Sequence, residues 1–114
     1  MLLEDEPRVA CALAYMITTM GYAVIQVNEV GLAKEIFERQ EEIMAIVADY
    51  GLDGEETGLD FLGWAKVHHP SARRILISGL NAGSLHGNIG EICDTFLPKP
   101  FDLDQLEEAL AITV

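Results

Sequence analysis

Five short apolar runs, separated by segments with helical spacing, constrain the fold of this chain more than any other sequence feature. The run at 43–48 is apolar at every position, as a strand buried on both faces should be. Strands that alternate with helices favour a parallel sheet covered on both faces. We therefore expect an α/β fold with five parallel strands, at residues 1–3, 23–27, 43–48, 74–77 and 95–98.

The intervening segments predict helices. Pro7 suits the first turn of one helix, where its missing N–H is not needed, and Gly21 follows its last apolar position. Asp102 is a plausible N-cap of the last helix, in which Leu103, Leu106 and Leu110 are expected to face inward. Glycines within 81–94 lower helix propensity, so a short helix is predicted there. The other predicted helices span 7–20, 29–39, 58–67 and 102–112.

The acidic charge balance excludes two classes of partner. The 114 residues fit one domain, expected to span 1–114, and carry 19 acidic against 7 basic side chains, a formal net charge of -12. Binding nucleic acid through its phosphates needs clustered lysine and arginine, and so does docking on an anionic membrane. We expect neither partner to bind this domain directly.

The cysteines and the hydropathy pattern indicate a cytoplasmic protein. Cys11 and Cys93 are far apart and have no metal-binding spacing, so they are interpreted as small buried hydrophobic residues in a reducing compartment. No apolar run approaches the roughly 20 residues that a membrane span needs.

Polar side chains follow four of the five predicted strands. Glu4 and Asp5 follow the first strand, Asp49 the third, Ser78 the fourth and Lys99 the fifth. Functional groups of a parallel sheet gather at the carboxyl ends of its strands, so these side chains should converge. Clustered carboxylate oxygens suit Mg²⁺, and a lysine and a hydroxyl are natural partners for phosphoryl oxygens.

Each of these positions has a simpler interpretation when taken alone. Glu4 and Asp5 precede a predicted helix, where acidic residues often cap the helix. Asp49 and Ser78 are common turn residues, and a lysine such as Lys99 is most often solvated. The metal-site hypothesis depends on all of these positions occurring in one chain.

Five segments, in order along the chain, resemble the receiver domain of two-component response regulators. The resemblance implies a flavodoxin-like doubly wound sheet with strand order 2-1-3-4-5. The segments are Leu-Leu-Glu-Asp-Glu-Pro at 2–7, Ala-Asp-Tyr-Gly-Leu at 48–52, Gly-Leu-Asp-Phe-Leu at 58–62, Ile-Ser-Gly at 77–79 and Leu-Pro-Lys-Pro-Phe at 97–101.

The resemblance assigns a role to each polar residue. Asp49 would be the phosphoacceptor, receiving a phosphoryl group from the phosphohistidine of a sensor histidine kinase or a histidine phosphotransfer protein. Glu4 and Asp5 would bind Mg²⁺ together with Asp49 and the backbone carbonyl of Gly51. Lys99 would pair with the phosphoryl group or with Asp49 itself.

Further expectations from the resemblance concern switching. Ser78 matches the switch hydroxyl, Phe96 matches the aromatic switch position, and the Lys99–Pro100 peptide bond is expected to be cis. The partner-binding surface would be formed by the fourth helix, the fifth strand and the fifth helix. Two features depart from the family pattern: only three residues precede Glu4, and the loop after Asp49 is one residue longer and lacks the common proline.

The function implied is that of a signalling module rather than an enzyme. It would catalyse only its own phosphorylation and dephosphorylation, and it would act through an output domain or a downstream protein. One alternative is a phosphorylation-independent interaction domain with the same fold. Another is a Mg²⁺-dependent phosphotransfer enzyme. Enzymes of the haloacid dehalogenase type need a second aspartate two residues after the nucleophile, and this chain has Gly51 at that position.

Overall fold

A five-stranded parallel sheet forms the centre of the protein. The computed structural model describes residues 1–39, 42–80, 85 and 87–111. The strand order is β2-β1-β3-β4-β5, which confirms the predicted topology. The elements in chain order are β1 (Leu2–Leu3), α1 (Pro7–Thr19), β2 (Gln26–Val27), α2 (Val30–Arg39), β3 (Ala45–Asp49), α3 (Gly58–His68), β4 (Arg73–Ser78), α4 (Ile89–Ile92), β5 (Thr95–Pro98) and α5 (Leu103–Leu110).

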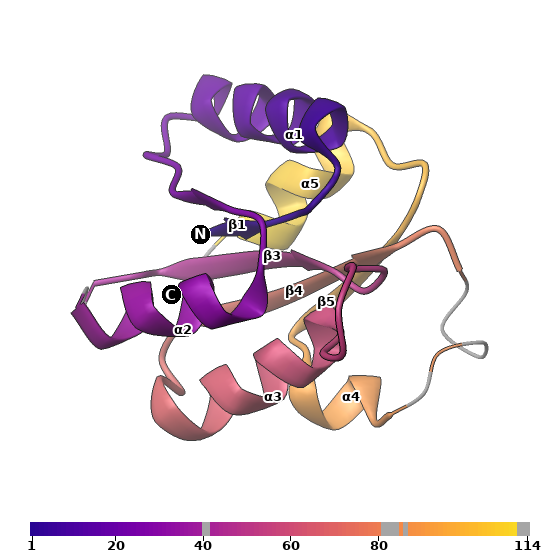
Figure 1. Ribbon diagram of the computed structural model, residues 1–114. Helices are drawn as coiled ribbons and strands as arrows, with labels where there is room; N and C mark the ends of the chain where they lie inside the picture. Colours follow the sequence, from indigo (N-terminus) through magenta and orange to yellow (C-terminus); the bar gives the residue numbers. More distant parts are fainter. Residues whose placement is uncertain (40–41, 81–84, 86, 112–114) are drawn as a thin grey trace.

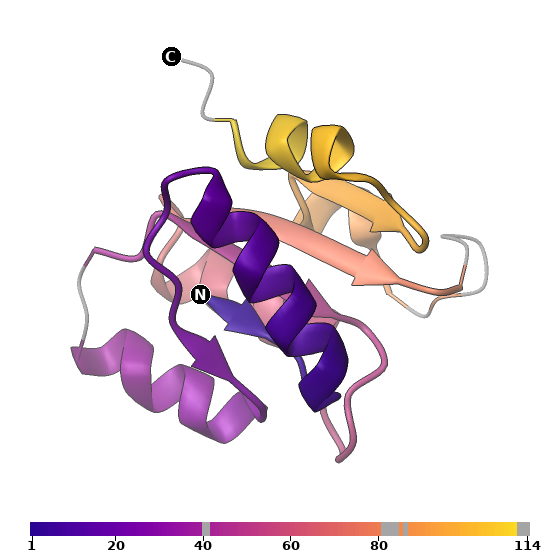
Figure 2. The ribbon, with the colours of Figure 1, turned by 90° about the horizontal axis from the view of Figure 1, so that it is seen from above.

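Helices cover both faces of the sheet. Helices α1 and α5 lie together on one face, and α2, α3 and α4 lie on the other (Figure 1). The view from above shows α1 crossing in front of the strands, with α5 beside β5 (Figure 2). No helix in the described part of the chain is long and apolar enough to cross a bilayer.

The central strands divide their side chains between two hydrophobic cores. Along β3, Ile46 and Ala48 pack toward α2 and α3, whereas Val47 packs toward α1 and α5. Successive strand residues point to opposite faces, so a strand buried on both faces must be apolar throughout. This alternation is the physical reason for the unbroken apolar run in the sequence.

The helix ends follow their predicted chemistry in most places. Pro7 is the first residue of α1, and Asp102 caps α5 through an oxygen that accepts from the Gln105 amide at 2.8 Å. The prediction for Leu103 is wrong, because its side chain is 42% exposed while Leu106 and Leu110 are buried. The prediction that both cysteines are buried is also corrected: Cys11 is exposed on α1, and Cys93 is half-buried.

Strand pairing explains why β1 and β2 are shorter than the apolar runs. Leu2 and Leu3 pair with Gln26 and Val27; before these, the Ile25 carbonyl accepts from the Leu2 amide at 2.8 Å, but residues 23–25 are not paired with a strand among the described residues. A run of β-branched residues is assigned as strand only where a neighbouring strand lies beside it. The predicted helix within 81–94 is reduced to α4 at Ile89–Ile92, and positions 81–84, 86 and 112 lie outside the described residues.

Candidate functional site

Three carboxylates converge at the carboxyl ends of β1 and β3. Glu4 and Asp5 follow β1, and Asp49 is the last residue of β3. One oxygen from each side chain lies within 4.8 Å of the others, so the three could share one cation. Glu4 is 2% exposed and Asp49 is 7% exposed, so this cluster is largely withdrawn from water.

Lys99 reaches this cluster from the far end of the chain. Its Nζ lies 3.1 Å from Asp49 Oδ2 and 3.5 Å from Glu4 Oε1, and its side chain is 31% exposed. Its backbone amide donates to the Ser78 carbonyl at 2.7 Å, which joins the end of β5 to β4, and the Lys99–Pro100 bond is cis. Lys99 is therefore not the freely solvated lysine of the simpler interpretation.

The pKa of Glu4 reflects its burial beside a second carboxylate. Burial raises the pKa of Glu4 to about 7, and its hydrogen bond with Asp49 adds to the shift. The Glu6 amide and the Lys99 ammonium oppose the shift without cancelling it. Glu4 and Asp49 thus share a site in which a proton, or a cation in its place, offsets their repulsion.

The cap of α1 belongs to another residue. Glu6 is the N-cap, and its Oε1 accepts from the Arg8 amide at 3.3 Å. Glu4 Oε2 instead accepts from the amide of Glu6 at 3.2 Å, which orients the glutamate before the helix begins. The helix-cap interpretation of Glu4 and Asp5 is therefore wrong.

Asp49 and Ser78 also make the short-range contacts typical of turn residues. Asp49 Oδ1 accepts from the Gly51 amide at 3.2 Å, and Ser78 Oγ accepts from the Leu80 amide at 3.0 Å. Strand register places both side chains at the same edge of the sheet, since Asp49 pairs with Ile77, the neighbour of Ser78. Ser78 is 3% exposed, so its hydroxyl is directed by the fold rather than by solvent.

Of the two remaining predicted site residues, Gly51 contacts Asp49, whereas Phe96 lies against the hydrophobic core. Phe96 lies within β5 opposite Leu76, half-buried against the core formed with α2 and α3. Gly51 is exposed in the loop after β3, where its amide contacts Asp49. The switch role of Phe96 and the metal-binding role of the Gly51 carbonyl stay predictions.

The loop after β3 folds back onto the acidic pair, which the sequence did not indicate. The Asp53 amide donates to Asp5 Oδ2 at 2.6 Å, and Glu56 forms an ion pair with Lys34 of α2 at 3.2 Å. Gly54, at a φ of +117°, follows Asp53 in this loop. The Asp-Gly pair signals a turn, but no local pattern shows which side chain its amides contact.

Comparisons with known proteins give the same architecture. No family model matches the sequence, and no curated protein matches it. Many solved structures do match, among them the response regulator TrrA from Thermotoga maritima in complex with Mg²⁺ and BeF, with a TM-score of 0.82, 21% identity and coverage of 94% of this chain and 90% of that one.

Two further structures show the same similarity. A response regulator from Burkholderia pseudomallei, with a phosphorylated aspartic acid, a calcium ion and citrate, matches with a TM-score of 0.84 and 22% identity over 96% of this chain and 64% of that one. A CheY-like receiver domain from Methylobacillus flagellatus matches with a TM-score of 0.84 and 21% identity over 96% and 92% of the two chains. The chain has the fold of response regulator receiver domains.

Proposed function

We propose that residues 1–114 act as a single cytoplasmic receiver domain that accepts a phosphoryl group on Asp49. The donor is the phosphohistidine of a sensor histidine kinase or a histidine phosphotransfer protein. One observation carries the proposal: Asp49 lies within a cluster of three carboxylates while Lys99 Nζ contacts its Oδ2 at 3.1 Å. Such a site brings together a nucleophilic carboxylate, a set of oxygens that can bind a cation, and an ammonium group in contact with the nucleophile.

The donor set fits Mg²⁺. Glu4, Asp5 and Asp49 offer carboxylate oxygens, and the Gly51 carbonyl would complete the protein ligands, with water in the remaining positions. Burial and the neighbouring Asp49 raise the pKa of Glu4, and the opposing effect of Lys99 is smaller. When bound, Mg²⁺ would supply charge neutralisation for the phosphoryl oxygens.

The residues of this chain have separate tasks in the transfer. A carboxylate oxygen of Asp49 forms a bond to phosphorus while the P–N bond of the phosphohistidine breaks and its electron pair returns to the imidazole. Lys99 offsets the charge of the attacking carboxylate and of the transferred group. Burial of Asp49 and Glu4 lowers the local dielectric, which strengthens these interactions.

The output follows from the position of Ser78. Its Oγ accepts from the Leu80 amide, so a hydroxyl drawn toward a new phosphoryl group would strain or shift this bond at the end of β4. Phe96 on neighbouring β5 would take up the space vacated. The surface formed by α4, β5 and α5 would then change its affinity for an output domain or a downstream protein.

Labelling by a small phosphodonor tests the proposal. Incubation with phosphoramidate and Mg²⁺ should add one phosphoryl group, which peptide mapping by mass spectrometry should locate on Asp49. Chelation of the metal should prevent the labelling. A chain that neither becomes labelled nor binds beryllofluoride with Mg²⁺ would be an interaction domain with a receiver fold, and multiple turnover on a free phosphate ester would indicate an enzyme.

Mg²⁺ affinity is expected to depend on pH because of Glu4. Its pKa in the folded protein is about 7, so below pH 7 a proton must leave before the carboxylate can bind metal. Affinity should rise about fivefold from pH 6 to pH 7 and about tenfold from pH 6 to pH 8, and it should level off above pH 8. Calorimetric titration of Mg²⁺ at each pH, in two buffers of different ionisation enthalpy, measures both affinity and proton release. Equal affinity at pH 6 and pH 8 would contradict the prediction.

A further inference from the structure

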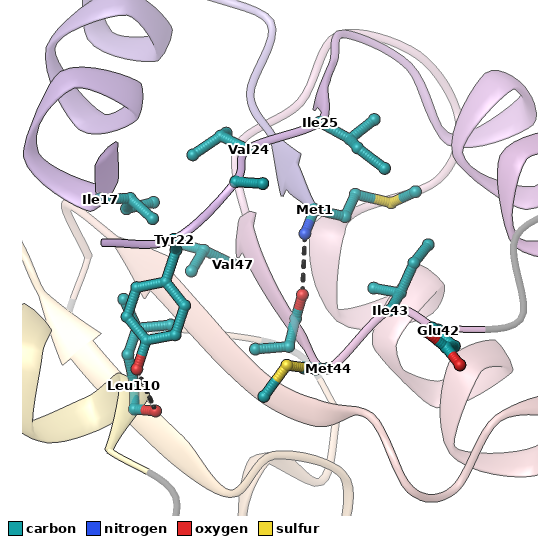
Figure 3. A pocket seen from close by; sticks show the side chains of 12 residues that line it. Met1, Ile17, Tyr22, Val24, Ile25, Glu42, Ile43, Met44, Val47 and Leu110 are labelled. Atoms are coloured by element: carbon teal, nitrogen blue, oxygen red, sulfur yellow. Dashed lines mark hydrogen bonds between the residues drawn. The ribbon is translucent and has the colours of Figure 1, made fainter. Parts of the chain in front are cut away.

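The two ends of the sheet differ in the chemistry that they offer. At the amino ends of β1 and β3, a cavity of about 300 Å³ is lined mainly by apolar side chains. Figure 3 shows Met1 at its centre, with Tyr22 and Leu110 on one side and Ile43 on the other. Its dashed lines mark hydrogen bonds from the Met1 nitrogen to the Ala45 carbonyl and from the Tyr22 hydroxyl to the Leu110 carbonyl. The carboxylates lie at the other end of these strands, where backbone amides hold them.

Each carboxylate of the cluster accepts a hydrogen bond from one backbone amide. For Glu4 and for Asp49 the donor is the amide two residues further along the chain, at 3.2 Å in both cases. Asp5 instead accepts, through Oδ2, from the amide of Asp53 at 2.6 Å. The bond to Asp5 is the shortest of the three, and it joins residues 48 positions apart.

Asp5 depends on its amide partner more than the other two carboxylates do. Lys99 Nζ contacts Asp49 at 3.1 Å and Glu4 at 3.5 Å. Within residues 1–39, 42–80, 85 and 87–111, Asp5 forms no ion pair and accepts no second hydrogen bond. Its side chain is half-buried, so without the Asp53 amide it could turn toward water. The orientation of Asp5 is therefore set by the loop after β3.

This loop presents the amide from a fixed frame. Near its start, the Leu52 amide donates to the Tyr50 carbonyl at 3.0 Å. At its end, Thr57 and Asp60 form the capping box of α3, with bonds of 2.8 and 3.1 Å. Between these points the chain turns at Gly54, whose φ of +117° is one that side chains rarely permit. The Asp53 amide is thus in place before any cation arrives.

The bond to Oδ2 leaves Oδ1 of Asp5 as the oxygen without a hydrogen bond in the described part of the chain. Hydrogen bonds to one part of a ligand fix the direction of the rest, and removing such a partner typically weakens metal binding by about 10–100-fold. One oxygen each from Glu4, Asp5 and Asp49 lies within 4.8 Å of the others. A fixed Asp5 keeps this arrangement ready for a divalent cation.

We propose that the backbone amide of Asp53 is a positioning group for the cation site: it holds Oδ2 of Asp5 and reserves Oδ1 for the metal ion. The proposal rests on the cation site of the proposed function. It makes the loop after β3 part of that site through its backbone, with no side chain of Asp53 as a ligand. A change that removes this amide hydrogen should weaken cation binding although all three carboxylates remain.

Two variants of one residue test the inference, because Asp53→Pro removes the amide hydrogen and Asp53→Asn keeps it. Calorimetric titration should show that Asp53→Pro binds Mg²⁺ about tenfold or more weakly than the unmodified chain. Asp53→Asn loses only an exposed charge, so its Mg²⁺ affinity should stay within about threefold. Equal Mg²⁺ affinities for the two variants would overturn the proposal.

Nuclear magnetic resonance of the unmodified chain gives a second measurement that needs no substitution. A hydrogen bond to a carboxylate should move the Asp53 amide proton downfield and slow its exchange with solvent. Both features should persist at saturating Mg²⁺, because the amide and the metal use different oxygens of Asp5. An amide proton that moves upfield and exchanges faster when Mg²⁺ binds would show that the metal displaces the amide, which overturns the proposal.

Failure of this inference can be told apart from failure of the phosphoacceptor proposal. If Asp53→Pro binds Mg²⁺ as tightly as Asp53→Asn while phosphoramidate still labels Asp49, only the positioning role is overturned. If the two variants differ in Mg²⁺ affinity as expected while Asp49 is not labelled, the positioning role stands and the phosphoacceptor role fails.

Discussion

Replacing Asp49 with asparagine is expected to abolish Mg²⁺-dependent labelling by phosphoramidate. The amide has nearly the same shape as the carboxylate, but it is a poor nucleophile and carries no charge for Lys99 or a metal to bind. Because Asp49 and Glu4 repel each other within a buried cluster, removing one charge should not lower the Tm. Mass spectrometry of the intact chain measures the labelling, and thermal unfolding confirms that the variant is folded.

Glu55→Gln is the matched control for this experiment. Glu55 is an exposed acidic residue of the loop after β3, and its replacement removes one negative charge close to Asp49 in the sequence. Labelling of Glu55→Gln should equal that of the unmodified chain. If Asp49→Asn were labelled as well as the control, another residue would be the acceptor, and the assignment would be wrong.

Replacing Gly58 with alanine is expected to damage both the fold and the site. A Cβ at this first residue of α3 would lie 2.1 Å from the carbonyl oxygen of Asp49 and 2.7 Å from its carbonyl carbon. Neither atom belongs to a flexible side chain, so α3 or the end of β3 must shift. We expect a loss of about 3 kcal/mol in the free energy of unfolding, seen as a fall of about 10 °C or more in Tm.

Gly63→Ala in the same helix separates this contact from the general effect of alanine. A Cβ at Gly63 would have its nearest neighbour, Ile92 Cδ1, at an ordinary 3.7 Å. Alanine in a helix interior is more favourable than glycine by roughly 0.5–1 kcal/mol, so Gly63→Ala should unfold at a higher temperature. Similar Tm values for the two variants would show that the close approach of α3 to the Asp49 backbone does not exclude a side chain at position 58. Phosphoramidate labelling should also be slower in Gly58→Ala, because the displaced backbone carries Asp49.

Much of the fold could be predicted because its determinants are local. The apolar run through Val47 requires a strand buried on both faces, and Asp102 begins a helix through contacts with its own neighbours. Once the strands are parallel, Asp49 and Lys99 must lie at the same edge. The meeting of these side chains could therefore be expected from chain order alone.

The remaining features depend on contacts between distant segments. Gly58 gives no sign in the sequence that Asp49 lies against it, and the Asp53 amide reaches Asp5 from 48 residues away. Cys11 was expected to be buried because cysteine usually is, but it lies on the exposed side of α1. Helical spacing alone leaves the edge of a buried face uncertain, which explains the exposure of Leu103.

The contacts of Lys99 have a consequence for the order in which the protein is made. Lys99 pairs with Asp49 across 50 residues of sequence and with Glu4 across 95. A growing chain that has emerged only as far as β4 holds its acidic residues without this ammonium to balance them. If Asp49 is the phosphoacceptor proposed above, competence to accept a phosphoryl group would therefore arise only after β5 has joined β4, and a partly synthesised chain would not compete for the donor.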